Sequence, residues 1–238
     1  MENRNIYDGY LDWKNWGENF GKLNTVDRRY YNLELKKLES NWKGKKVKVL
    51  EIGFGNGTFL TYARDKDWDI HGIEINDDLI NSAKDHDFKV SKSIDDYDDN
   101  TFDLIVAFDV LEHILADELI DFICKIKNKL NHGGKFIARF PNGDSPIGMR
   151  NQNGDLTHLN SIGSNKIIQL SKICKLELIS IKGQGEIFIY NSIKKSLYTI
   201  ILFPIKMAIN FIMKSIFFPT SYYFFSSENL IIILKKAN

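Results

Sequence analysis

The chain has 238 residues and carries 32 Lys and Arg against 31 Asp and Glu, a formal net charge of +1. Its length suits one large α/β domain, and an apolar share of 43% excludes a disordered chain. A general nucleic-acid binder usually carries a clear basic excess, so the balanced charge predicts no nucleic-acid partner.

Residues 1–42 precede the first predicted strand and are rich in aromatic side chains. The first residues are polar, so we expect no signal peptide, and a helix is predicted to begin near Thr25. Trp13 and Trp16 could close over a ligand, or simply pack on the core. The aromatic side chains are Tyr7, Tyr10, Trp13, Trp16, Phe20, Tyr30, Tyr31 and Trp42.

From residue 46 onwards, short apolar runs alternate with segments of helical period. Strands are predicted at 47–52, 70–75, 88–93, 102–108, 135–140, 176–181 and 230–234. Helices are predicted at 58–66, 77–86 and 111–130, the last of them ended by Gly133 and Gly134. This alternation indicates an α/β fold with a Rossmann-like, doubly wound sheet of seven mostly parallel strands, covered by helices on both faces.

Residues 187–227 form a long apolar insertion before the last strand. It has no acidic residue, and Pro204 predicts two short helices; its lysines are Lys194, Lys195, Lys206 and Lys214. A basic amphipathic helix can lie in a membrane interface, but a homodimer face or a cover over the substrate pocket remains open. No uncharged apolar run reaches about 18 residues, so no membrane-spanning helix is expected.

We therefore expect a single domain over residues 1–238, with residues 1–42 as a helical N-terminal lid. Cys124 and Cys174 both lie in apolar segments fifty residues apart. Buried free thiols in a reducing cytoplasm are favoured over a disulfide. The predicted location is cytoplasmic, with a peripheral contact on the inner face of the membrane if the insertion binds lipid.

The clearest motif is a glycine-rich turn, in which Gly53, Gly55 and Gly57 follow a buried strand and precede a helix. Glycines allow a tight turn and a close approach by a ligand, and the helix N-terminus offers free N–H groups. A dinucleotide fingerprint would need a further glycine at the position that Thr58 occupies. The turn therefore predicts a cofactor other than a dinucleotide.

Two carboxylates narrow the choice of cofactor. Glu51 lies two residues before the first glycine and suits a cationic amino group rather than a pyrophosphate. Glu74 ends the second predicted strand, where it can accept both hydroxyls of a ribose. A ligand with a ribose, an ammonium group and no phosphate fits these groups, and S-adenosylmethionine is such a ligand.

With these motifs the sequence resembles the class I S-adenosylmethionine-dependent methyltransferases over about residues 45–182. The resemblance assigns cofactor binding to Glu51, Gly53, Phe54, Gly55, Gly57, Glu74, Ile75, Ser93, Ile94 and Phe108. At the adenine-side position the family often has Asp, whereas this chain has Ser93 and Ile94. Phe108 to His113 resembles the family motif that borders the methionine end, and 130–135 resembles the turn before the fifth strand.

An acidic run lies between the third and fourth predicted strands and could suggest a metal cage. Its aspartates are Asp95, Asp96, Asp98, Asp99, Asp103 and Asp109. A solvated acidic loop is the better interpretation, because most of the run precedes the strand. We therefore predict no metal site. Glu112, a little further on, can be read as an acid that begins a helix.

Methyl transfer is an in-line displacement, so the protein must position the acceptor and, for a hydroxyl, remove its proton. His158, in a polar loop beyond the fifth strand, is the first candidate for base or substrate contact, with Asp155 orienting its ring. His113, after the fourth strand, is the second, unless it merely packs near the cofactor. His158 could also merely cap the next helix.

Residues 139–142 and 155–158 resemble a subgroup of these enzymes found with bacterial polysaccharide biosynthesis. That resemblance implies O-methylation of a sugar or sugar-linked acceptor in surface-glycan biosynthesis. The apolar insertion favours an alternative, a methyltransferase acting on a lipid or quinone at the membrane surface. A third possibility is a scaffold that binds the cofactor without catalysis.

Overall fold

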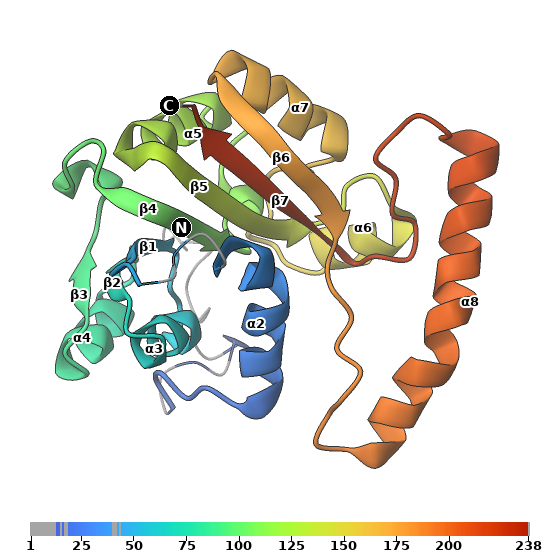
Figure 1. Ribbon diagram of the computed structural model, residues 1–238, viewed down its shortest axis with the longest axis horizontal. Helices are drawn as coiled ribbons and strands as arrows, with labels where there is room; N and C mark the ends of the chain where they lie inside the picture. The colour runs from blue at the N-terminus through green and yellow to red at the C-terminus, as the bar shows by residue number, and fades with distance from the viewer. Residues whose placement is uncertain (1–12, 15, 17–18, 40–41, 43, 238) are drawn as a thin grey trace, which may run out of the picture.

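The computed structural model describes residues 13–14, 16, 19–39, 42 and 44–237, so Tyr7, Tyr10 and the polar first residues lie outside the described part. A seven-stranded sheet in the order β3-β2-β1-β4-β5-β7-β6 forms its centre (Figure 1). The strands are β1 Lys48–Ile52, β2 Asp69–Ile73, β3 Lys89–Ser91, β4 Phe102–Phe108, β5 Leu130–Pro141, β6 Leu176–Gly183 and β7 Asn229–Lys236. Neighbouring strands pair in parallel from β3 to β5, while β7 pairs antiparallel with both β5 and β6. The predicted mostly parallel doubly wound sheet is confirmed.

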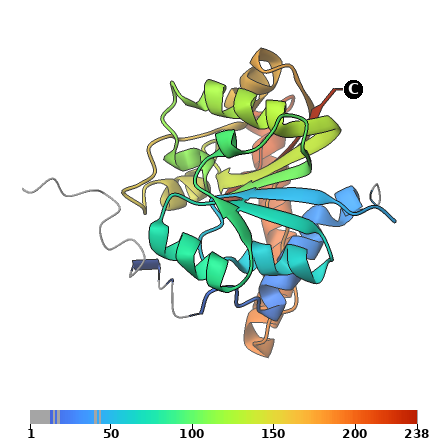
Figure 2. The same cartoon turned by 90° about the vertical axis from the view of Figure 1, so that its left-hand side faces the viewer.

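Helices cover both faces of the sheet, as Figure 2 shows with the sheet seen near its edge. A hydrophobic core lies on each face, because successive residues of a strand point to opposite faces of the sheet. In β4, Leu104 packs with α2, α3 and α4 on one face, whereas Ile105 packs with α5 and α7 on the other. The helices are α2 Thr25–Glu39, α3 Thr58–Asp65, α4 Asp77–Asp85, α5 Leu119–Lys129, α6 Pro146–Gln152 and α7 Ser164–Ile173. The predicted helix near Thr25 is confirmed as α2.

The predicted long helix over 111–130 is wrong in its first and last parts. Leu111–His113 forms only a short 3₁₀ turn, η3, and α5 begins at Leu119. Leu111 is fully buried, so its apolar period reflects packing of the turn against the core rather than a continuous helix. At the other end, Gly133 and Gly134 lie inside β5, which already begins at Leu130.

The two cysteines are joined in a disulfide, so the expectation of free thiols is wrong. Cys124 lies on α5 and Cys174 caps the end of α7. The two helices pack on the same face of the sheet, which brings the Cα atoms of the cysteines to 5.3 Å, within the range of a disulfide. A pairing across fifty residues depends on this packing, which the sequence does not reveal.

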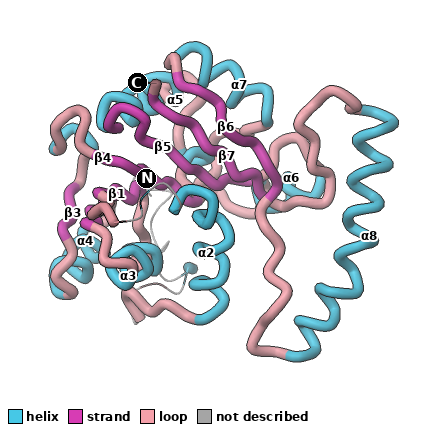
Figure 3. Tube along the Cα trace, in the orientation of Figure 1, coloured by secondary structure: helices cyan, strands magenta, loops and turns pink. Residues whose placement is uncertain are grey.

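The insertion forms one long helix, α8 Ile193–Phe217, which stands beside the domain on two extended connections (Figure 3). The expected division into two helices is wrong, because Pro204 removes one backbone hydrogen bond without ending the helix. By length and composition alone, α8 could cross a membrane: its most apolar stretch has a mean hydropathy of 1.7 and is not buried. Lysines interrupt the uncharged apolar run in the sequence, yet the mean hydropathy of this stretch stays high, so the expectation of no membrane-spanning helix stays a prediction.

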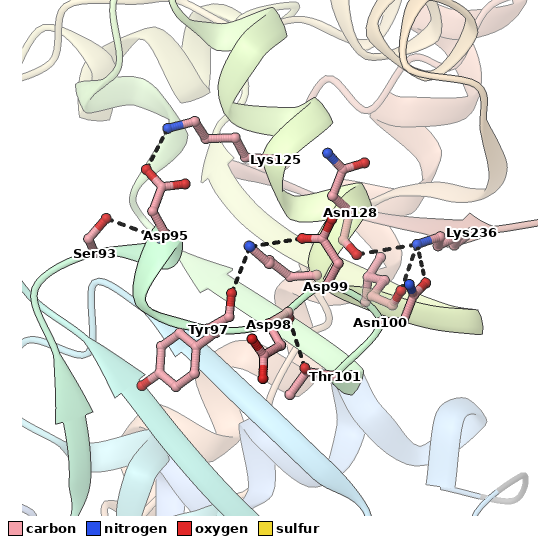
Figure 4. A network of polar contacts seen from close by, with 12 residues as sticks. Ser93, Asp95, Tyr97, Asp98, Asp99, Asn100, Thr101, Lys125, Asn128 and Lys236 are labelled. Atoms are coloured by element: carbon pink, nitrogen blue, oxygen red, sulfur yellow. Dashed lines mark hydrogen bonds and ion pairs between the residues drawn. The ribbon is translucent and has the colours of Figure 1, made fainter.

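The acidic run before β4 is held by cations on neighbouring elements, as Figure 4 shows. Lys125 of α5 pairs with Asp95 at 2.7 Å. Lys129 pairs with Asp99 at 2.8 Å and also donates to the carbonyl of Tyr97. These ion pairs fasten the loop to α5, and the acids are distributed along it rather than gathered around one point.

Gly57 allows a test of the turn that leads into α3. It has a φ of +70°, and an added Cβ would meet the ring of Phe20. Gly44 has a φ of +76°, and a Cβ added there would meet no atom within 4 Å. An alanine at Gly44 would therefore carry the same backbone strain as one at Gly57 but no clash with a neighbouring side chain. We expect Gly44→Ala to lower the free energy of unfolding by about 1 kcal/mol and Gly57→Ala by about 2 kcal/mol or more.

Urea unfolding of both variants measures the difference. Equal losses in the two variants would contradict a packing role for Gly57 against Phe20.

Candidate functional site

Two adjoining cavities lie at the carboxyl ends of the central strands, on either side of the glycine turn. The first has a volume of about 690 Å³ and the second about 580 Å³, both within the usual size of a small-molecule site. Trp16, Gly53, Asp109 and His113 line both cavities. One elongated ligand could therefore extend from one cavity into the other.

The glycine turn has the backbone that the motif predicts. Gly53 and Gly55 have φ values of +67° and +49°, which glycine adopts without strain. Trp16 lies over this turn, since an added Cβ on Gly55 would come within 2.8 Å of its ring. Gly57 lines neither cavity and instead lies against Phe20, so its place in the structure is in the wall that supports the turn.

Glu51 is buried and has no counter-charge among the described residues. It ends in the first cavity, its residue is 4% exposed, and its Oε2 has no hydrogen-bond partner within the described part of the chain. Burial raises the pKa of Glu51 well above its usual range, and nearby Glu74 raises it further. A cationic group entering the first cavity would remove this penalty by pairing with the carboxylate.

Glu74 lines the second cavity in a fixed orientation. Its carboxylate accepts hydrogen bonds from the backbone N–H groups of Gly55 at 3.1 Å, Ile75 at 2.8 Å and Asn76 at 3.2 Å. Ser93 and Ile94 line the same cavity beside it. The orphaned Glu51 oxygen in one cavity and the oriented Glu74 in the other fit the ammonium and the ribose of S-adenosylmethionine. Phe54 and Phe108, which were also predicted to bind the cofactor, line the first cavity.

A cluster of titratable side chains lines the first cavity opposite the glycine turn. His158 Nε2 lies 3.7 Å from Asp155 Oδ2 and 3.9 Å from Glu112 Oε1. His113 packs edge-on against His158, with ring centroids 4.8 Å apart, and donates from Nδ1 to the carbonyl of Thr157 at 2.9 Å. The structure thus brings together all three residues predicted for catalysis.

The backbone explains why two distant segments meet here. The carbonyl of Glu112 in the η3 turn accepts hydrogen bonds from the N–H groups of Leu159 at 2.8 Å and Asn160 at 3.0 Å. These bonds hold the loop of His158 against the end of β4. Glu112, interpreted above as an acid that begins a helix, lies instead in the short 3₁₀ turn η3. It is a buried member of the cluster at 1% exposure.

The surroundings set different charges on the members of the cluster. Burial raises the pKa of Glu112 well above its usual range, and Asp109 adds to the rise. For Asp155, burial acts in the same direction, but hydrogen bonds from Thr157 and Lys14 outweigh it and hold the pKa below its usual range. Burial lowers the pKa of His113. At neutral pH, Asp155 is therefore the anionic partner of His158, while burial favours the neutral forms of Glu112 and His113.

The ion pair between Arg139 and Asp109 was not predicted from the sequence. Arg139 on β5 donates from Nε to Asp109 Oδ1 at 2.8 Å, and a second bond joins its guanidinium to Oδ2. Both side chains line the first cavity. Asp109 follows directly after β4 with a φ of +58°, and its strained backbone places the carboxylate toward β5. Lys14, Arg150 and Glu228 also line this cavity without having been predicted.

Glu112, His113 and His158 could also hold a metal ion by their geometry. Each offers one ligand atom, and these atoms all lie within 4.8 Å of one another. The donation from His113 to a carbonyl leaves its other ring nitrogen as an acceptor, as in many metal-bound histidines. The prediction that the chain has no metal site therefore stays a prediction.

Comparisons with known proteins agree with the fold and the cofactor. Residues 25–176 match the family described as "Methyltransferase domain". A crystal structure of a SAM-dependent methyltransferase from Archaeoglobus fulgidus superposes with a TM-score of 0.64 at 21% identity, covering 88% of this chain and 94% of that one. The fold is that of the class I S-adenosylmethionine-dependent methyltransferases. The chain belongs to this methyltransferase family.

Curated relatives match over a smaller share of their length. The chain is 30% identical over 110 residues to an uncharacterized methyltransferase of Staphylococcus carnosus, covering 45% of this chain and 52% of that protein. It is 26% identical over 218 residues to phosphoethanolamine N-methyltransferase 3 of Arabidopsis thaliana, covering 78% of this chain and 43% of that protein. The chain thus spans about half the length of the curated relatives it matches.

The raised pKa of Glu51 predicts a pH-dependent affinity for the cofactor product. Because the free carboxyl keeps its proton and an ammonium ion prefers the carboxylate, the affinity for S-adenosylhomocysteine should rise as pH increases through the raised pKa. Calorimetry over a series of pH values should show this rise in the wild type. Glu51→Gln should bind more weakly at the upper end, with little pH dependence.

Glu118→Gln is the matched control, because Glu118 is exposed at the start of α5 and lines neither cavity. Identical pH profiles for the wild type and Glu51→Gln would contradict a role of Glu51 toward the ammonium group.

Proposed function

We propose that the chain O-methylates a hydroxyl group of a sugar or sugar-linked small molecule, with His158 as the base. The observation that carries this proposal is the His158–Asp155 pair in the first cavity, beside the glycine turn. A methyl acceptor that lacks an ionised nucleophile must lose a proton during transfer, and a histidine backed by an anionic carboxylate removes one effectively.

Two carboxylates are proposed to bind the cofactor, and the His158–Asp155 pair to act on the acceptor. Bound S-adenosylmethionine supplies a methyl group that is already activated on a sulfonium. Glu51 and Glu74 would hold its ammonium and ribose, and Trp16 covers the turn between them. His158 takes the proton of the acceptor hydroxyl, and Asp155 orients the ring and stabilises the imidazolium that forms. The chain otherwise acts by holding the two reactants in line.

The lining of the first cavity favours a polar acceptor. It presents many charged and amide side chains, which are Lys14, Glu51, Asn56, Asp109, Glu112, Arg139, Arg150, Asn151, Asp155, Glu228 and Asn229. Trp13 and Trp16 also line it, and indole rings can stack on the faces of sugar rings. Such a lining supports a hydroxyl-rich acceptor, as in surface-glycan precursors, more than a quinone or a bare lipid.

A second candidate, methylation of a lipid or quinone at a membrane surface, is favoured by the exposed helix α8 alone. The two acceptor classes separate by extraction, since sugars partition into water and quinones into organic solvent. A cofactor-binding scaffold, the third possibility, would label neither fraction. The proposed setting for the reaction is the cytoplasm.

Transfer of a deuterated methyl group tests both the acceptor class and the base. We expect the wild type to label an aqueous, hydroxyl-bearing small molecule from a cell lysate, identified by mass spectrometry. His158→Ala should lower turnover by about 10²-fold or more while the affinity for S-adenosylhomocysteine stays unchanged. His132→Ala, which removes an exposed histidine far from both cavities, should behave like the wild type.

Unchanged turnover in His158→Ala would contradict its role and point to His113. A labelled product only in the organic phase would overturn the sugar-type acceptor, and no labelled product in either phase would favour the scaffold.

Chelation distinguishes a proton-transfer site from a metal site at the same residues. Burial raises the pKa of Glu112 and so disfavours the carboxylate form that binds a metal ion, and we therefore expect turnover to withstand dialysis against EDTA. A loss of turnover on chelation that added Mg²⁺, Mn²⁺ or Zn²⁺ restores would contradict this prediction. It would assign Glu112, His113 and His158 to a metal site.

A further inference from the structure

Helix α8 has one face turned to the protein and the rest of its surface exposed. The half-buried and buried positions recur every three or four residues and are Ser196, Thr199, Leu202, Phe203, Lys206, Asn210 and Met213. Lys206 pairs there with Glu186 at 3.3 Å, and Asn210 bonds to Ser226 at 2.7 and 2.8 Å. This narrow stripe fixes the helix to its two connecting segments.

The opposite side of α8 is a continuous apolar surface. Leu197, Ile201, Phe211, Ile212 and Ile216 are all more than half exposed, and the row extends over the full 25 residues of the helix. At 1.5 Å per residue the surface is about 37 Å long. An exposed apolar area of this extent normally marks a binding surface. Something must cover it in the working protein.

The topology excludes a helix that crosses a bilayer. The insertion leaves from the end of β6 and returns to the start of β7, and these positions are neighbours, joined by a hydrogen bond from Gln184 to Asn229 at 3.0 Å. A single crossing would leave the end of α8 on the far side of the membrane. Residues 218–228 would then have to return through hydrocarbon as irregular backbone with unpaired N–H and C=O groups.

The connections are instead fastened to the domain. Asn142 donates from its side chain to the carbonyls of Phe224 at 2.9 Å and Ser227 at 3.0 Å. On the other side of the insertion, Arg29 of α2 donates to the carbonyl of Ile189 at 2.6 Å. Both ends of α8 are thus held beside the same domain, as Figure 1 shows, with the helix lying along its flank.

The charges favour lipid over a second copy of the chain. Residues 187–227 contain no acidic residue. Lys194, Lys195 and Lys214 are exposed and form no ion pair within the described part of the chain. A symmetric dimer through α8 would bring these lysines together without a balancing acid. Anionic headgroups would balance them, and lysine stems can reach the headgroups from a helix that lies in the interface.

We propose that α8 is an in-plane membrane anchor, which lies in the interface of an anionic bilayer with its Leu197–Ile201–Phe211 side in the hydrocarbon. The domain then sits on the membrane surface. This inference concerns where the enzyme works and does not depend on which acceptor it methylates. Lys206 pairs with Glu186 and the ammonium of Lys195 lies 4.1 Å from the centroid of the Tyr190 ring, so the lysines that face the headgroups are Lys194 and Lys214.

Vesicle flotation tests the anchor. We expect the wild type to float with vesicles containing about 30% phosphatidylglycerol and to bind less to pure phosphatidylcholine. Ile201→Glu/Phe211→Glu should lower the vesicle-bound fraction about tenfold or more. The control Ile173→Glu/Ile179→Glu adds the same charge at exposed apolar positions outside α8 and should bind like the wild type.

Unchanged affinity of the double variant for S-adenosylhomocysteine shows that the domain is folded and separates this test from the proposed reaction. Alkaline carbonate should release the bound wild type, whereas retention in the bilayer would overturn the in-plane arrangement. Failure of the wild type to float would overturn the anchor. If sedimentation then showed a dimer that Ile201→Glu/Phe211→Glu dissociates, the partner would be a second copy.

Discussion

Glu51 is the penultimate residue of β1, near the centre of the sheet, and its carboxyl group is buried beside the glycine turn. Burial without a counter-charge in the described part of the chain disfavours the ionised form of this carboxyl group, which lines the first cavity. The arrangement becomes favourable when a cation enters. The remaining site follows from it: Glu74 is oriented through the same turn, and the cluster of His158 faces it across the first cavity.

The sequence was sufficient for features that depend on neighbouring residues. The strand, the glycine turn and the following helix lie within one short segment, so the turn and both acids could be predicted together. The parallel sheet followed from the alternation of apolar runs and helical periods. His158 and Asp155 could be paired because only two residues lie between them in one loop.

Features that depend on packing between distant segments could not be predicted from local sequence patterns. Arg139 meets Asp109 because β4 and β5 pair with Phe108 opposite Arg139, a register that no local pattern reveals. Glu112 joins His158 through backbone bonds from the loop after α6. The disulfide requires α5 and α7 to lie side by side. In α8, Pro204 lies within the helix without ending it, so the sequence pattern alone does not show that the helix is continuous.

Helix α8 and the cavities are connected through one segment of the chain. Residues 218–228 lead from the end of α8 to Glu228 and Asn229, which line the first cavity, and Asn142 fastens this segment on the way. A domain held on a bilayer by α8 would thus keep a fixed orientation of its acceptor cavity. A polar cavity on a membrane-bound enzyme suits a water-soluble acceptor whose reactive part is a sugar.

A crystal structure of the chain with S-adenosylhomocysteine tests the central claim most directly. We predict that the amino group of the ligand lies against Glu51, that its ribose hydroxyls bond to Glu74, and that its sulfur faces the cavity of His158. A ligand whose ribose lies away from Glu74, or whose amino group avoids Glu51, would contradict the account.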